Sequence, residues 1–209
     1  AMALMDILVA IYIVQLLPDA LLRSICRAIF KWAYNVEVKG LENFEKAGDR
    51  ILIIANHTSF LDAALIAAYL PNKITFAVNT HIARAWWMQP LLRMVDAYPV
   101  DPTNPLALKS LIDVVKSGKT GMIFPEGRIA MTGSLTKAYE GPGMIADKAG
   151  AMVLPIRIDG AQYTPFSRSA GKTVLRRFPK ITMTILPPRK FELPEGVFGR
   201  RRRQPPTPA

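Results

Sequence analysis

Residues Arg50 to Leu70, RILIIANHTSFLDAALIAAYL, decide the fold because the spacing of their apolar residues changes within one short stretch. Arg50 to Ala55 is a short isoleucine-rich run typical of a buried strand, and the segment near Leu61 to Leu70 has the length and composition of a helix. Ser59 is a good N-cap for that helix and would place Asp62 at its third position. The stretch therefore predicts a strand, a tight turn and a helix.

The same alternation continues along the chain. Further strands are predicted at Ile74 to Val78, Ala97 to Val100, Thr120 to Phe124, Met152 to Ile158 and Ile181 to Leu186. Further helices are predicted near Ala83 to Val95, Pro105 to Ser117 and Gly143 to Ala149. Alternating strands and helices are typical of an α/β domain with a largely parallel central sheet flanked by helices, which we expect over residues 35–195. Residues 196–209 are basic and proline-rich, and predict a tail or linker.

Composition and charge exclude several kinds of site. The single Cys26 cannot form an internal disulfide, and two histidines without a cysteine cluster argue against structural zinc, so we expect no metal. The net charge of +11 fits nucleic acid, anionic lipid or an acidic carrier protein as partner. Basic and aromatic residues do not interleave along one strand or helix, so no nucleic-acid partner is expected. The charge gathers near apolar or terminal segments, which favours a membrane.

Residues 1–34 predict a pair of membrane-associated helices that precedes the α/β domain. Met2 to Leu17 is almost wholly apolar. As a helix it would span roughly 24 Å, which is less than the ~30 Å hydrocarbon core of a bilayer. A half-buried interfacial helix and the end of a longer spanning helix both fit this length.

Ala20 to Tyr34 predicts the second helix of the pair, with a basic stripe beside an apolar face. The stripe consists of Arg23, Arg27 and Lys31, and Trp32 belongs to the apolar face. This pattern is typical of a helix in the headgroup layer, where we expect these four residues to contact lipid. The alternative is a helix packed on the core with a solvated basic face.

His57 and Asp62 are the first candidates for chemistry. The predicted strand ends just before His57, and sites in α/β sheets lie at the carboxyl ends of strands. Residues five apart on a helix diverge by roughly 140°, so the two side chains meet only if His57 folds back over the first turn. Asp62 would then orient the imidazole and leave its other nitrogen as a base. Alternatively, Asp62 only closes a capping box with Ser59.

A second candidate turn follows the apolar run Gly121 to Phe124. Pro125, Glu126 and Gly127 are turn residues, and the turn is predicted to expose Glu126 and Arg128 at a strand end. An arginine side chain is well matched to a phosphate group. The alternative is an ordinary turn with solvated charges.

Together these motifs resemble the glycerolipid acyltransferases, the family of lysophosphatidic acid acyltransferases. The resemblance rests on Asn56-His57-x-x-x-x-Asp62 with Phe124-Pro125-Glu126-Gly127 and covers roughly residues 30–190. Val153 to Ile156 and Lys137 to Gly143 are similar to two further blocks of the family. Two departures, Pro102 and Ile129 where the family commonly has arginine, resemble one subgroup. That subgroup is the acyltransferase part of the bifunctional 2-acylglycerophosphoethanolamine acyltransferase/acyl-carrier-protein synthetase.

The resemblance implies an enzyme without metal or cofactor on the cytoplasmic face of the bacterial inner membrane. His57 would deprotonate the hydroxyl of a lysophospholipid, first of all lysophosphatidylethanolamine, as it attacks the thioester of acyl-carrier protein or acyl-CoA. Asp62 would stabilise the imidazolium, and the acceptor would be bound by Glu126, Gly127, Arg128 and Lys137. A fused or associated lysophospholipid transporter and acyl-carrier-protein synthetase are further implied partners. A lysophosphatidic acid acyltransferase and a non-catalytic basic lipid-binding module remain the alternatives.

Overall fold

The computed structural model describes residues 18–71, 73–79, 95–100, 105–131, 141–168 and 174–191, with Asp6 and Leu92 as single positions. The helices predicted at Met2 to Leu17 and Ala83 to Val95 lie almost wholly outside these residues, as does the tail 196–209. The division of the chain near residues 34 and 195 therefore stays a prediction.

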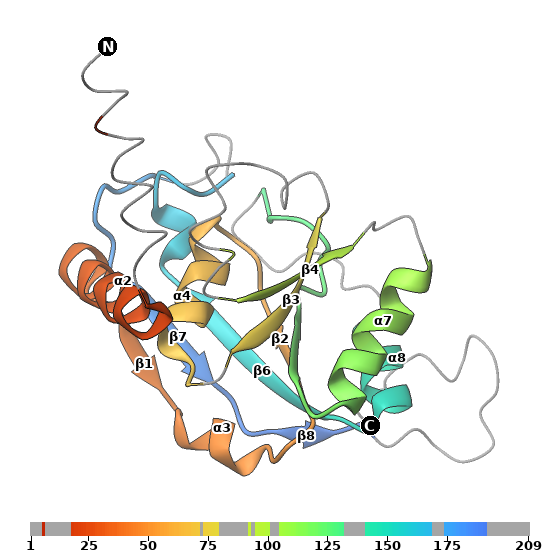
Figure 1. Cartoon of the computed structure of the whole chain (residues 1–209). Helices are drawn as coiled ribbons and strands as arrows, with labels where there is room; N and C mark the ends of the chain where they lie inside the picture. Colours follow the sequence, from red (N-terminus) through yellow and green to blue (C-terminus); the bar gives the residue numbers. More distant parts are fainter. Residues whose placement is uncertain are drawn as a thin grey trace, which may run out of the picture.

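The described strands form one mixed, mostly parallel sheet, as the alternating pattern predicts (Figure 1). The strands are β1 (Glu37–Lys39), β2 (Ile51–Ala55), β3 (Ile74–Asn79), β4 (Asp96–Val100), β5 (Thr120–Ile123), β6 (Met152–Asp159), β7 (Thr182–Ile185) and β8 (Arg189–Lys190). Their order is β1-β7-β6-β2-β5-β3-β4, and β8 pairs with β6. Only the pairs of β6 with β7 and with β8 are antiparallel among the described strands. The short strands β1 and β8 are not predicted by the sequence pattern.

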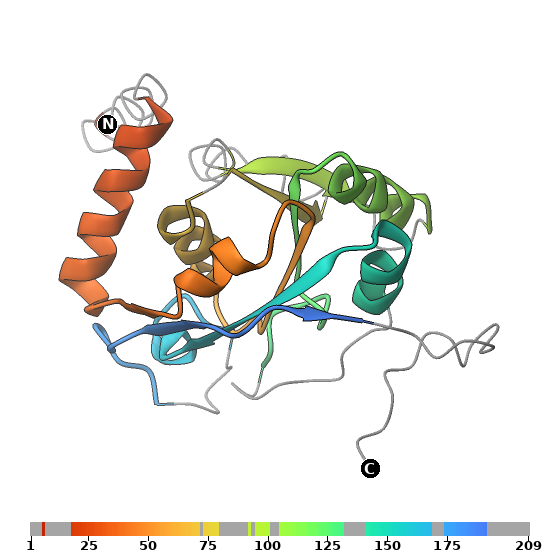
Figure 2. The same ribbon diagram turned by 90° about the horizontal axis from the view of Figure 1, so that it is seen from below.

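Helices cover both faces of this sheet, and Figures 1 and 2 show them in two groups. The helices are α2 (Asp19–Tyr34), α3 (Glu42–Lys46), α4 (Leu61–Tyr69), α7 (Pro105–Lys116) and α8 (Gly141–Ala149), and a short 3-10 turn, η2 (Ala161–Tyr163), follows β6. Alternate residues of β2 serve the two groups: Ile51 and Ile53 belong to the cluster under α3 and α4, whereas Leu52 packs with α7 and α8. A strand buried on both faces explains the continuous apolar run in the sequence.

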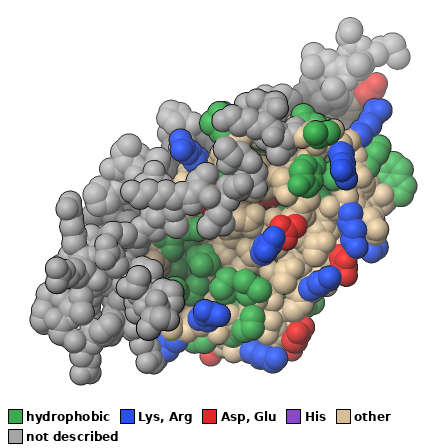
Figure 3. Space-filling model, turned by 180° about the vertical axis from the view of Figure 1, so that it is seen from behind, with side chains coloured by type: hydrophobic (Ala, Val, Ile, Leu, Met, Phe, Trp, Pro, Cys, Tyr) green, Lys and Arg blue, Asp and Glu red, His purple; other side chains and the backbone are tan. Residues whose placement is uncertain are grey.

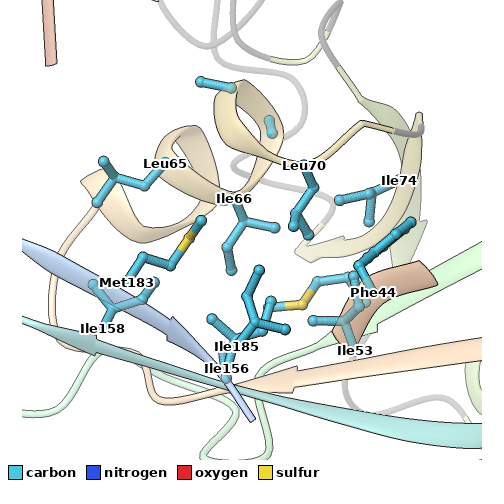
Figure 4. Packing of buried hydrophobic residues seen from close by; sticks show 14 of the residues in the cluster. Phe44, Ile53, Leu65, Ile66, Leu70, Ile74, Ile156, Ile158, Met183 and Ile185 are labelled. Atoms are coloured by element: carbon cyan, nitrogen blue, oxygen red, sulfur yellow. The ribbon is translucent and has the colours of Figure 1, made fainter. Parts of the chain in front are cut away.

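Helix α4 sits directly over the sheet (Figure 4). Its Leu65 and Ile66 are fully buried, and they face Ile156 of β6 and Met183 and Ile185 of β7 in a single apolar cluster. Tight packing of this kind leaves a helix little freedom to shift. The first turn of α4, which carries Asp62, is therefore held firmly against the sheet.

Helix α2 packs beside α4 in an orientation that differs from the sequence prediction. The Arg23 guanidinium donates to the carbonyl oxygens of Ala67 (2.8 Å) and Leu70 (3.2 Å), and that of Arg27 donates to the Ala68 carbonyl. The last carbonyls of a helix have no partner within the helix, and arginine side chains can satisfy them. Two residues of the predicted lipid-contacting stripe therefore hold the end of α4, and their contact with lipid stays a prediction.

The same packing agrees in part with the alternative of a core-packed helix with a solvated basic face, since α2 packs on the core and Arg27 and Lys31 are exposed, but it also leaves an apolar edge of α2 exposed. Leu22, Phe30 and Tyr34 are buried against the domain. The exposed edge consists of Leu21, Ile25, Ile29 and Trp32. Among the described residues, no helix has both the length and the apolar character needed to cross a bilayer.

Candidate active site

The turn between β2 and α4 brings His57 and Asp62 together. The His57 Nδ1 atom lies 3.1 Å from Asp62 Oδ2, and the same oxygen accepts the backbone N–H groups of Thr58 (2.6 Å) and Ser59 (2.8 Å). The capping role and the orienting role of Asp62 are thus not alternatives, since one carboxylate oxygen serves both. The predicted fold-back of His57 over the first turn is confirmed. The helix begins at Leu61, so Asp62 is its second residue and not its third.

This geometry suits His57 for proton transfer. Asp62 is fully buried, whereas the side chain of His57 keeps 17% of its surface exposed. A carboxylate that accepts the Nδ1–H fixes the tautomer in which Nε2 carries the lone pair. It also stabilises the imidazolium that forms when Nε2 takes a proton.

Asn56, which follows β2, is hydrogen-bonded through its side chain to the neighbouring strand β6. Its Nδ2 donates to the Ile158 carbonyl, and its Oδ1 accepts the Ile158 N–H, both over 2.8 Å. The side chain thereby extends the parallel pairing of β2 with β6 by one step beyond Ala55. Asn56 is part of the sequence motif, but its role cannot be read from the sequence because its partner lies 102 residues away.

The turn after β5 surrounds His57, because β2 and β5 are parallel neighbours in the sheet. The Phe124 ring stacks on the imidazole, with centroids 3.9 Å apart and planes 12° apart. Glu126 Oε1 accepts the His57 backbone N–H (3.1 Å), and the Ala130 N–H donates to the His57 carbonyl (2.7 Å). One turn therefore contacts the ring and both backbone polar groups of His57.

The exposure of this turn corrects one prediction and agrees with another. Arg128 is exposed, as expected, but Glu126 is only 2% exposed. Its carboxylate turns inward and accepts the His57 backbone N–H. Gly127 has φ 65°, a conformation that favours glycine, and it lets the chain reverse between the buried carboxylate and the exposed guanidinium. The acceptor-binding roles predicted for Glu126, Gly127 and Arg128 stay predictions, and Lys137 lies outside the described residues.

Comparison with known proteins finds relatives of this chain. The chain is 30% identical to the chloroplastic 1-acyl-sn-glycerol-3-phosphate acyltransferase BAT2 of Brassica napus over 131 residues, which are 61% of this chain and 38% of that protein. It is 29% identical to the 1-acyl-sn-glycerol-3-phosphate acyltransferase of Pseudomonas aeruginosa over 136 residues, 62% of this chain and 51% of that one. The chain thus spans about half or less of the length of these relatives.

A solved structure has the same fold. The crystal structure of the 1-acyl-sn-glycerophosphate acyltransferase PlsC from Thermotoga maritima superposes with a TM-score of 0.65 at 24% identity, over 87% of this chain and 71% of that one. The sequence pattern of the family described as Acyltransferase matches residues 35–159, which include His57, Asp62 and the whole turn after β5. Since this match covers more than half of the chain, the protein belongs to the acyltransferase family.

Proposed function

We propose that this protein transfers an acyl chain from a thioester to the free hydroxyl of a lysophospholipid, with 1-acylglycerol 3-phosphate as its acceptor. The observation that carries the proposal is the 3.1 Å pair of His57 and the buried Asp62 at the carboxyl end of β2. The acceptor is suggested by the relatives, which are named 1-acyl-sn-glycerol-3-phosphate acyltransferases. On the sequence alone, this acceptor is the alternative to lysophosphatidylethanolamine.

In the proposed reaction, His57 Nε2 removes the hydroxyl proton while the acceptor oxygen attacks the thioester carbonyl. Asp62 stabilises the resulting imidazolium. When the tetrahedral intermediate collapses, the C–S bond breaks, the new C–O ester bond remains, and the imidazolium returns the proton to the departing thiolate. General-base catalysis of this kind typically contributes about 10²–10⁴-fold to the rate.

Arg128 is our candidate for the acceptor phosphate. It is exposed, and two residues away Glu126 contacts the backbone of His57. A guanidinium can bind phosphate oxygens through two parallel hydrogen bonds, which fixes orientation as well as affinity. Lys137 is proposed as a further phosphate contact on sequence grounds alone.

Lysophosphatidylethanolamine is the second candidate acceptor because of Pro102, which stands where the family commonly has an arginine. A phosphodiester carries one negative charge beside a cationic headgroup, so it requires one arginine fewer than a terminal phosphate. Residue 102 lies outside the described residues, and this argument rests on the sequence. The bifunctional subgroup, with its fused transporter and acyl-carrier-protein synthetase, is proposed on the same ground.

We also propose that the protein works at the cytoplasmic face of a membrane with acyl-carrier protein or acyl-CoA as donor. The exposed apolar edge of α2 supports contact with lipid, and the basic charge suits either anionic donor. The side of the membrane and the choice of donor follow from the resemblance.

The decisive experiment measures acyl transfer in vesicles by the whole chain. Acyl-carrier-protein and acyl-CoA donors are each offered against phosphatidic and ethanolamine lyso-acceptors, with His57→Ala alongside. Turnover of the phosphatidic acceptor that is lost in His57→Ala supports the proposal. Turnover of the ethanolamine acceptor alone favours the second candidate. If vesicles bind a folded protein that shows no turnover with any pair, the protein is a lipid-binding module.

A further inference from the structure

The connection between β6 and β7 carries large apolar side chains in water. Val174 is 78% exposed, Leu175 53% and Phe178 59%. Two exposed arginines, Arg176 and Arg177, stand between Leu175 and Phe178. Scattered single apolar residues are common on protein surfaces, but three within five residues indicate a contact surface. On the face shown in Figure 3, hydrophobic side chains likewise lie in groups among lysines and arginines.

This segment meets the exposed edge of α2. The Phe178 ring lies edge-on to Trp32, which is 84% exposed, with centroids 6.4 Å apart, and equally close to Tyr34. Residues far apart in the sequence thus form one apolar surface. We call it the α2–loop surface, and its residues are Leu21, Ile25, Ile29, Trp32, Val174, Leu175 and Phe178.

The other end of the same connection contacts the catalytic motif. The Phe166 backbone carbonyl accepts the Phe60 backbone N–H (3.1 Å), and the hydroxyl oxygens of Ser59 and Thr164 lie 3.3 Å apart. Phe60 and Phe166 both have exposed rings. Residues 174–178 of this connection lie beside its first residues, since Arg176 donates its backbone N–H to the Tyr163 carbonyl (2.7 Å), and Phe178 reaches Trp32 of α2. The described parts of the connection therefore contact both the turn that carries His57 and the α2–loop surface.

The charges around this surface fit an anionic bilayer. The Arg176 guanidinium lies 5.8 Å from the Tyr163 ring centre, and that of Arg177 lies 5.9 Å from that of Phe178. Arginines that flank exposed apolar side chains place their charge at the level of lipid headgroups when those side chains enter the acyl region. An acidic carrier protein would be attracted by the same arginines, but that attraction does not require Val174 or Leu175 to be exposed.

We propose that the β6–β7 connection is a second membrane-binding element, which inserts Val174, Leu175 and Phe178 beside α2 into an anionic bilayer and sets the catalytic turn at the headgroup level. The proposal deepens the proposed function, since it explains how a lipid acceptor could reach His57 without leaving the membrane. The test measures binding to vesicles and needs no turnover, so this proposal and the proposed acyl transfer can fail separately.

The experiment compares Val174→Glu/Leu175→Glu with Leu186→Glu in flotation with phosphatidylglycerol-containing vesicles and with pure phosphatidylcholine vesicles. Leu186 is a matched control because it is 41% exposed and follows the opposite end of β7. We expect the double variant to lose about tenfold or more of its affinity for the anionic vesicles. Leu186→Glu and His57→Ala should bind as the unchanged protein does.

A second measurement covers the case in which other segments dominate the affinity. Val174→Cys and Leu186→Cys, each in a Cys26→Ser background, are labelled with an environment-sensitive dye. Anionic vesicles should shift the emission of the label at residue 174 to the blue and leave that at residue 186 unchanged. No shift at residue 174 overturns the proposal. A shift caused by acyl-carrier protein without vesicles, together with none from vesicles, overturns it in favour of a carrier-protein docking site.

Discussion

Substitution of Glu126 tests whether the turn after β5 positions His57 or binds the acceptor. The Glu126 carboxylate is buried and accepts the His57 backbone N–H over 3.1 Å. A hydrogen bond to a charged group contributes about 1.5–3 kcal/mol. If the whole of this free energy serves to hold His57 in its catalytic position, Glu126→Ala lowers the fraction of correctly placed imidazole by about 10- to 150-fold. We expect a loss of kcat in that range.

Glu126→Gln is the matched variant, because its amide oxygen can still accept the same N–H. A neutral hydrogen bond has about half the strength of a charge-assisted one, so kcat should fall by only about 3- to 12-fold. Since neither variant removes a group that touches the acceptor in this interpretation, the acceptor KM should stay within about twofold. Arg128→Ala should do the opposite and raise the acceptor KM.

The assay is initial-rate kinetics with the acceptor varied at saturating donor, and thermal unfolding checks that each variant is folded. One result would refute the reasoning. If Glu126→Ala raises the acceptor KM by about tenfold or more at unchanged kcat, the carboxylate binds the acceptor, as the sequence alone suggested.

Three further predictions concern the support of the site. Asp62→Asn should lower kcat by about 10²–10⁴-fold with little change in stability, because the amide can cap the turn but cannot balance the charge on His57. Stopped-assay rates and circular dichroism test this, and a near-normal kcat would contradict it. Arg23→Ala should lower the free energy of unfolding by about 1 kcal/mol, because its hydrogen bonds to the carbonyls at the end of α4 are lost. Urea titration measures this, and an unchanged midpoint would mean that water replaces the guanidinium. Gly160→Ala should lower the free energy of unfolding by about 1–3 kcal/mol, because φ is 95° and the added Cβ would lie 2.1 Å from a carbonyl oxygen. Gly118→Ala, at φ 83° with open space around the added Cβ, should lower it less in the same titration.

The elements predicted from the sequence are those with a clear local composition, length or apolar pattern. The run Ile51 to Ala55, buried on both faces, and the helix from Leu61 are visible because their patterns depend on neighbours a few residues away. The pairing of His57 with Asp62 is equally local. By contrast, β1 has only three residues and α3 only five, which is too few for a period to appear.

Local pattern therefore determined the α/β class and the strand that ends at Ala55, and it predicted the pairing of His57 with Asp62 beside the alternative of a capping role. The strand order was decided only by the tertiary structure, which puts β5 beside β2 and so brings Phe124, Glu126 and Ala130 onto His57. The inward turn of Glu126 and the orientation of α2 have the same origin. In each case a backbone group accepts a hydrogen bond from, or donates one to, a side chain that is distant in sequence, where no period of two or 3.6 residues can indicate it.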